Sequence, residues 1–290
     1  MVKRFTFLLI VALLAMAAGL CACARKPAAV AQGGGIQAAW LDYSLSEFDL
    51  AVEKFEAAFA AAAPGSDERL QALYGLATTW NLRRPGEDLD KARGLYEQVL
   101  EEAPQHDVAA WSLLGLARMK HLVPVGEEPD YPAVYRAYQE VIDRFPGHLA
   151  AEEAFIYLQA ALISTLKEKE TRQALAALEG FVKDPSKKFI GPAYSLMAVS
   201  YQTLNMPEER LWAEQKSLET TEVDPANPFT EFAWQYRNLA TIAEFEVGDF
   251  DTARKYYRKL IEEYPTDIRM YGAKQALKRM DEVEARIRKD

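Results

Sequence analysis

Residues 248–253 read Gly-Asp-Phe-Asp-Thr-Ala, and this stretch decides the fold because it joins two helical patterns. Residues 238–247 before it are amphipathic, and over 250–264 apolar residues recur every three or four positions, which places them on one helical face. The glycine and aspartate supply the turn, and Pro265 ends the second helix because proline cannot continue one. The pattern predicts a hairpin of two helices, with the small side chain of Ala253 where they cross.

Prolines recur along the chain at a nearly constant interval, and each follows a helical apolar pattern. The intervals are 40, 42, 39, 40 and 40 residues. The six prolines are Pro64, Pro104, Pro146, Pro185, Pro225 and Pro265. Such regular helix stops predict two-helix units that stack and bury one another's apolar faces. We therefore expect one continuous superhelix, although a length of 290 residues alone suggests about two domains.

The units resemble the tetratricopeptide repeat. The last unit fills the family's Gly-Asp-aromatic, alanine, aromatic and proline positions at 248–253, Tyr257 and Pro265. Matching residues in other units are Ala92, Tyr96, Trp111, Leu114, Gly115, Tyr194, Ala198, Tyr201 and Ala213. The resemblance implies an all-α solenoid of tetratricopeptide-like helical hairpins, with about six repeats of ~40 residues over 38–265.

The repeats differ from the family in length and regularity. The family's usual period is about 34 residues, and the surplus here lies in longer turns between helices, at 82–88 and 122–131. The units that end at Pro64 and Pro185 are degenerate. After the last repeat, residues 266–290 form a further helical pattern with a charged opposite face, which is predicted to cap the end of the stack.

The N-terminus resembles a bacterial lipoprotein signal. A short basic start is followed by a nearly uninterrupted apolar run and then by small residues, as in a secretory signal peptide. Residues 20–23, Leu-Cys-Ala-Cys, resemble a lipobox, which implies lipidation at Cys23 and removal of residues 1–22. Residues 23–37 are rich in Pro, Ala and Gly, and they are predicted to form a lipidated flexible tether.

Two other interpretations of the N-terminus remain open. The small residues around Cys23 also fit the rule for ordinary signal cleavage, which would release a soluble protein. The second is an uncleaved membrane anchor, although the apolar run is short for a hydrocarbon core of ~30 Å. In the lipoproteins that the chain resembles, aspartate after the cysteine favours the inner membrane. Ala24 stands here, so the resemblance implies the outer membrane, facing the periplasm.

Composition narrows the classes of function. The chain has 43 acidic and 34 basic residues and a net charge of -9, which fits nucleic-acid binding poorly because phosphate neutralisation needs clustered Lys and Arg. Two cysteines and three histidines nearly exclude a disulfide scaffold, a Cys-rich zinc site and an iron–sulfur cluster. We therefore expect no cofactor and no metal ion.

Motifs for catalysis are absent from the sequence, including H-E-x-x-H, Walker A and G-x-S-x-G. His106, His121 and His148 are interpreted as surface or packing residues. Carboxylate pairs such as Glu152-Glu153 have the chemistry for acid–base catalysis, but most lie at helix ends or in turns and are interpreted as solvated faces. The chain is therefore predicted not to be an enzyme.

In the tetratricopeptide family, the first helices of the hairpins line a concave groove that receives an extended peptide or a partner helix. Matching the family's inward-facing positions to this chain gives candidate groove residues on three first helices. They are Thr79, Trp80, Ser112, Leu116, Met119, Lys120, Arg237, Thr241 and Phe245. Two interpretations of Lys120 and Arg237 remain open: they pair with a partner's carboxylates, or they are simply solvated.

These observations lead to two hypotheses for function. The first is a non-catalytic, membrane-anchored lipoprotein that acts as a protein–protein interaction scaffold in cell-envelope assembly, with envelope proteins in its groove and the membrane held through the N-terminal lipid. The alternative is a lipoprotein whose groove binds envelope glycan strands or an exported polysaccharide through aromatic and acidic residues. Tetratricopeptide folds serve many functions, so the fold does not choose between them.

Overall fold

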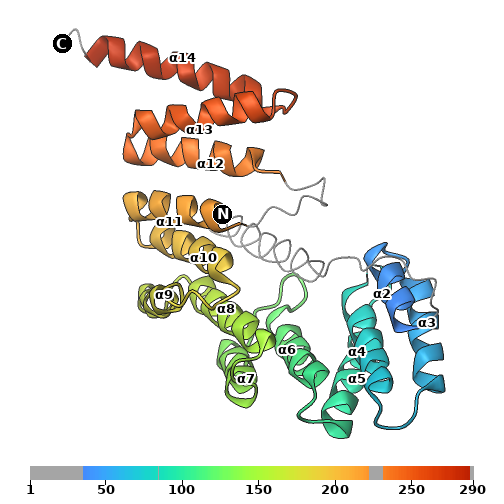
Figure 1. Cartoon of the computed structure of the whole chain (residues 1–290). Helices are drawn as coiled ribbons and strands as arrows, with labels where there is room; N and C mark the ends of the chain where they lie inside the picture. The colour runs from blue at the N-terminus through green and yellow to red at the C-terminus, as the bar shows by residue number, and fades with distance from the viewer. Residues whose placement is uncertain (1–34, 84, 222–230, 288–290) are drawn as a thin grey trace. The chain divides into compact units, whose positions relative to one another are not determined.

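The computed structural model describes residues 35–83, 85–221 and 231–287. In these ranges the regular elements are thirteen α-helices and one short π-helix, without a strand (Figure 1). The predicted all-α, tetratricopeptide-like fold is confirmed. Cys23 and the predicted signal peptide lie outside the described residues. No helix inside these ranges is both long and apolar enough to cross a membrane.

The helices follow one another in pairs, and each repeat proline lies after the second helix of a pair. In chain order they are α2 (Ile36–Ser44), α3 (Phe48–Ala61), α4 (Asp67–Leu82), α5 (Leu89–Glu102), α6 (Asp107–His121), α7 (Tyr131–Arg144), α8 (Leu149–Ser164), α9 (Glu168–Phe181), α10 (Ile190–Thr203), α11 (Pro207–Thr220), α12 (Ala233–Ile242), η1 (Ala243–Val247), α13 (Phe250–Glu263) and α14 (Arg269–Ile287). Helices α2–α3, α4–α5, α6–α7, α10–α11 and α12–α13 pack as hairpins.

The helices form two compact units. Unit 1 contains α2 to α8 and ends at Ser164, and unit 2 begins at Thr165 and contains α9 to α14. The boundary lies between the two helices of the fourth predicted repeat. One continuous superhelix across this boundary stays a prediction.

Unit 1 depends on close approach between first and second helices. Gly115 lies against the ring of Tyr96, and a Cβ atom added to this glycine would stand 2.7 Å from the ring. Gly75 approaches the ring of Phe55 even more closely. Both aromatic rings are buried, with 2% of Tyr96 and none of Phe55 exposed. Glycine is therefore the residue that lets these helices pack at this distance.

Two histidines link the N-termini of successive first helices in unit 1. The Nδ1 atom of His106 accepts the backbone N–H two residues further on, and its Nε2 lies 3.1 Å from Asp67 in the first turn of α4. His148 repeats the arrangement at the start of α8, with Nε2 2.9 Å from Asp107 in the first turn of α6. Each imidazole thus caps its own helix and reaches the neighbouring one.

Unit 2 contains the hairpin that the sequence predicts most clearly. Ala253 on α13 is fully buried. The first helix ends differently from the expectation, because α12 passes into the π-helix η1 before the turn. Gly248 then adopts a left-handed conformation with φ of 80°, as a helix end requires. Asp249 caps α13 by accepting the backbone N–H of Thr252 at 3.0 Å.

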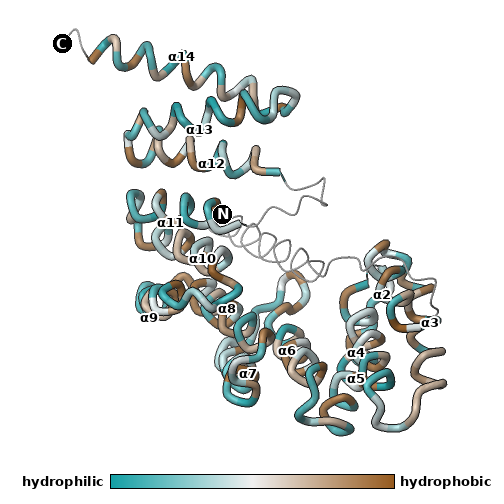
Figure 2. Tube along the Cα trace, in the orientation of Figure 1, coloured by the Kyte–Doolittle hydropathy of each residue, from teal (hydrophilic) through white to brown (hydrophobic). Residues whose placement is uncertain are grey.

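Helix α14 covers α13 at the end of unit 2. It buries Ala273, Ala276 and Met280, and its remaining surface is mostly hydrophilic (Figure 2). The buried Glu244 of η1 links α14 to α13. Its carboxylate accepts hydrogen bonds from Arg279 on α14 at 2.8 Å and from the hydroxyl of Tyr257 on α13 at 2.9 Å. A buried carboxylate needs such partners to offset its lost hydration.

Candidate interaction site

Some of the predicted groove residues of α4 and α6 are buried in unit 1. Thr79 and Ser112 are fully buried, and the Thr79 hydroxyl donates to the backbone carbonyl of Gly75 at 2.8 Å. These two side chains are therefore not available to a partner in this structure. Trp80 is half-buried, with the ammonium group of Lys91 3.9 Å from the centre of its ring.

The other candidate groove residues keep some exposure. They are the half-buried Leu116, Met119 and Thr241 and the exposed Lys120, Arg237 and Phe245. The ring of Phe245 is 64% exposed and lies 5.0 Å from the guanidinium of Arg279. The candidates on α6 belong to unit 1 and those on α12 and η1 belong to unit 2. Contact of these residues with a partner stays a prediction.

A different group of polar and aromatic side chains comes together inside unit 1, and we call it the tyrosine–arginine cluster. Its members come from five successive helices, α4 to α8. They are Tyr74, Tyr96, Arg118, His121, Tyr138, Glu153 and Tyr157. The helices that carry them follow one another in unit 1 (Figure 1).

Helical periodicity explains how the first helices contribute to this cluster. On α6, Arg118 and His121 follow Leu114 by four and seven positions, which places the three residues on one face. On α8, Glu153 and Tyr157 are four positions apart and share a face in the same way. The second helices add Tyr96 and Tyr138, which resemble the family's aromatic position.

Direct contacts join the members of the cluster. The rings of Tyr138 and Tyr157 stack with centroids 5.7 Å apart, and the Tyr138 hydroxyl lies 3.0 Å from Nδ1 of His121. The guanidinium of Arg118 lies 5.2 Å from the centre of the Tyr157 ring. The rings of Tyr74 on α4 and Tyr96 on α5 are tilted relative to each other, with their centroids 6.1 Å apart. These contacts join α6, α7 and α8 to one another, and they join α4 to α5.

Burial controls the protonation of these groups. Burial raises the pKa of Tyr96 and Tyr138, so both hydroxyls remain protonated at neutral pH. Burial also raises the pKa of Glu153, while the charge of Arg118 opposes this effect. For His121, burial and then the charge of Arg118 lower the pKa to about 4, so its ring is neutral at physiological pH.

Sequence reasoning did not identify this cluster. The Glu152-Glu153 pair was expected to be a solvated face, whereas Glu153 is half-buried beside Arg118. His121 was expected to be a surface or packing residue, and it packs edge-on against Tyr138. The available signal was the spacing of Arg118 and His121 on the face of α6 that also carries apolar Leu114.

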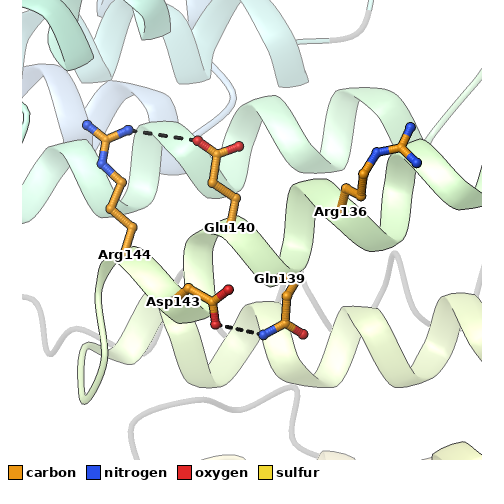
Figure 3. A pocket seen from close by; sticks show the side chains of 5 residues that line it. All are labelled: Arg136, Gln139, Glu140, Asp143 and Arg144. Carbon is orange, nitrogen blue, oxygen red and sulfur yellow. Dashed lines mark hydrogen bonds and ion pairs between the residues drawn. The ribbon is translucent and has the colours of Figure 1, made fainter.

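A surface pocket on α7 of unit 1 has no comparable chemistry. It has a volume of about 410 Å³ and is lined by five residues of α7 alone (Figure 3). The polar groups there pair with each other along the helix, Gln139 with Asp143 at 2.8 Å and Arg144 with Glu140 at 3.9 Å. Among the residues that the structure describes, no three His, Cys, Asp or Glu side chains gather as metal ligands.

A comparison with protein families agrees with the repeat architecture over part of the chain. Residues 232–267 match the tetratricopeptide repeat family. No curated protein matches the chain. A solved structure, the assembly chaperone of RpL4 (Acl4), is 14% identical with a TM-score of 0.47, and the alignment covers 88% of this chain and 98% of that chain. The chain is a tetratricopeptide-like helical-repeat protein. This class of fold indicates a protein-interaction scaffold.

The low pKa of His121 predicts acid sensitivity in unit 1. The pKa of His121 is about 4 in the folded protein, and its ordinary value is about 6.5. At a pH between these two values, the unfolded chain therefore binds one more proton than the folded protein does. The contribution of the neutral His121 ring to the free energy of unfolding is fully present above about pH 6.5. It is lost as the pH falls towards 4. His121→Gln keeps a polar side chain beside Tyr138 but removes the titration.

We expect His121→Gln to lose less stability than the unchanged protein between pH 7 and pH 4.5. Urea unfolding followed by circular dichroism at both pH values measures this. The neighbouring exposed Lys120→Gln is the control, which should keep the original acid sensitivity. An identical loss in all three proteins would show that His121 is not the titrating group.

Proposed function

We propose that this protein is a non-catalytic lipoprotein of the bacterial cell envelope, where it acts as a protein–protein interaction scaffold in envelope assembly. The observation that carries the proposal is the combination of a lipobox-like segment ending at Cys23 with tetratricopeptide-like hairpins that begin at Ile36. Scaffold surfaces of this kind bind through many distributed contacts, which suits the absence of a catalytic motif in the sequence.

The anchor in this proposal is the lipid on Cys23. Several acyl chains on one cysteine hold a protein stably at a bilayer, whereas a single chain binds only marginally. Twelve residues lie between Cys23 and Ile36, and a flexible segment of this length spans about 20 Å on average. Unit 1 would therefore stay close to the membrane surface. The residue after the cysteine, Ala24, favours the outer membrane and its periplasmic face.

Capture of partners in living cells tests the proposal. The intact protein and Cys23→Ala are crosslinked in cells, and each is purified and examined for lipid and for bound proteins. Cys21→Ala is the matched control, because it leaves the lipobox-like pattern complete. We expect lipid and a discrete envelope partner with the intact protein and with Cys21→Ala, and loss of the lipid with Cys23→Ala. Lipid on Cys23→Ala, or no discrete partner with any form, would contradict the proposal.

A second candidate function is binding of envelope glycans, favoured by an exposed aromatic pair in unit 2. Trp212 on α11 is 42% exposed and meets Tyr194 on α10 edge-to-face at 5.6 Å. On the same two helices, the hydroxyls of Ser195 and Ser217 lie 2.7 Å apart at the surface. Exposed aromatic faces next to hydroxyl groups suit sugars. Retention on purified envelope glycans that is lost in Trp212→Ala would support this candidate.

A further inference from the structure

Helix α2 of unit 1 has apolar side chains on its outer face. Its buried residues Ile36 and Ala39 pack with residues of α3 and α4. Leu41 lies about 140° around the helix from Ile36, and Leu45 follows one turn later, where its backbone N–H donates to the carbonyl of Leu41 at 3.0 Å. These two leucines are 43% and 63% exposed. Both therefore lie on the side of α2 that is turned away from the core.

Helix α3 adds a third exposed leucine just beyond the turn. Leu50 is 46% exposed and lies about 140° around α3 from the buried Phe55. We call Leu41, Leu45 and Leu50 the leucine patch. The other exposed leucines of the described chain are at least seven residues apart in sequence. Single exposed apolar residues are normal on a protein surface, but three from one hairpin turn indicate a surface that something covers.

The charges beside the leucine patch are largely paired. Asp42 lies 2.5 Å from the ammonium group of Lys54, and Asp49 lies 2.7 Å from the guanidinium of Arg83. Paired charges are less costly to bring towards an apolar surface than isolated ones. Glu47, in the turn between the leucines, is exposed and keeps a negative charge at the patch. The patch is therefore suited to an apolar surface of low negative charge.

We propose that the leucine patch contacts the surface of the bilayer that holds the lipid on Cys23, with its leucine side chains between the lipid head groups. This inference rests on the proposed lipoprotein function, and it specifies the face of unit 1 that is turned towards the membrane. Apolar side chains at a bilayer surface bind in proportion to the apolar area that they bury.

The position of the patch in the chain places it within reach of the membrane. Twelve residues lie between Cys23 and Ile36, and they span about 20 Å on average and at most about 45 Å when fully extended. Helix α2 has nine residues, which adds only about 13 Å. The lipid therefore keeps the patch at a high local concentration near the bilayer, where a weak contact is sufficient.

Charge disfavours the other surfaces that are able to cover the patch. Residues 35–164 carry 21 acidic and 10 basic side chains. Two copies of unit 1 therefore repel each other at long range, and unit 1 is repelled by a strongly anionic bilayer as well. A bilayer of zwitterionic lipid presents neither obstacle. We accordingly expect the contact to be strongest on zwitterionic lipid.

Fluorescence quenching in vesicles tests this contact. In the mature lipidated protein the thiol of Cys23 carries the lipid and Cys21 has been removed, so an introduced cysteine is the single free thiol. Leu45→Cys is labelled with the fluorophore NBD in full-length lipidated protein in phosphatidylcholine vesicles, with or without nitroxide groups on the acyl chains. We expect the nitroxide lipid to reduce the emission about twofold or more, because interfacial side chains reach the acyl boundary.

Matched variants separate the leucine patch from the label and from simple proximity. The same label at Glu97→Cys, on the exposed surface of α5, should show little quenching. Leu41→Gln, an exposed position whose fold is checked by circular dichroism, should reduce the quenching of the label at position 45. Vesicles that also contain anionic phosphatidylglycerol should reduce it too.

Equal quenching at positions 45 and 97, no quenching at position 45, or quenching that Leu41→Gln leaves unchanged would overturn the proposed contact. Emission from position 45 that is blue-shifted in detergent and not quenched by nitroxide lipid would identify a second copy as the occupant instead. Mass spectrometry of the same sample measures the lipid on Cys23. Where the lipid is present, these results remove the leucine patch alone. Absence of the lipid removes the proposed lipoprotein function, and the membrane contact with it.

Discussion

Replacing Tyr138 by alanine is expected to lower the free energy of unfolding by about 3–5 kcal/mol, the usual cost of removing a buried aromatic side chain and leaving a cavity. Tyr138 has no exposed surface, and its ring stacks on Tyr157 from the next helix. The loss would therefore affect both the packing of α7 and the tyrosine–arginine cluster. Urea unfolding followed by circular dichroism measures the change.

Tyr138→Phe separates the ring from its hydroxyl. Phenylalanine keeps the stacked ring and removes only the group that lies 3.0 Å from His121. We expect this variant to lose about 1 kcal/mol, the typical value for one hydrogen bond. A loss for Tyr138→Ala no larger than that for Tyr138→Phe would show that the ring is not the core residue described here.

Replacing Ala253 by tryptophan is expected to destabilise unit 2 by about 1–3 kcal/mol through overpacking. Ala253 is fully buried on α13, in the core that this helix shares with α12. No space exists there for an indole, so the helices must separate or the side chain must take a strained conformation. The change should appear as a lower midpoint of thermal unfolding.

The matched control for this variant is Arg258→Trp, which places the same side chain on the exposed surface of α13. We expect it to change the midpoint very little, because surface substitutions usually have small effects. Equal midpoints for Ala253→Trp and the unchanged protein would refute the helix crossing at Ala253.

Much of the fold could be predicted because its signals are local. The Gly-Asp turn at 248–249 and the proline after each second helix act through backbone conformation alone, and the structure places the hairpins between them. The additional helix predicted within 266–290 is present as α14. Its mostly polar surface follows directly from the charged positions of the pattern.

Features that depend on contacts distant in sequence could not be predicted in this way. The segment before Gly248 has an ordinary helical pattern, yet it ends as a π-helix. In that conformation Glu244 points inward and bonds to Arg279, thirty-five residues away. Periodicity contains no information about such a partner. The division of the chain after Ser164 is likewise a property of packing between helices.

The candidate site shows the same limit. Family positions indicated the face of α6 that carries Ser112 and Lys120, and the structure buries the first of these. The tyrosine–arginine cluster lies on another face of the same helix. Its members come from five helices, and each helix contributes only one or two of them. Glu153 is half-buried because α6 packs near α8, and nothing in its own segment shows this.

Site-specific photocrosslinking in cells tests most directly whether unit 1 receives a protein partner at its candidate groove residues. A photoreactive amino acid is placed at Lys120, the exposed candidate on α6, and separately at Arg136, on the exposed surface of α7 and outside the candidate set. The account predicts one discrete crosslinked protein from position 120 and much less from position 136. No crosslinked protein from position 120, or the same product in equal yield from both, would contradict it.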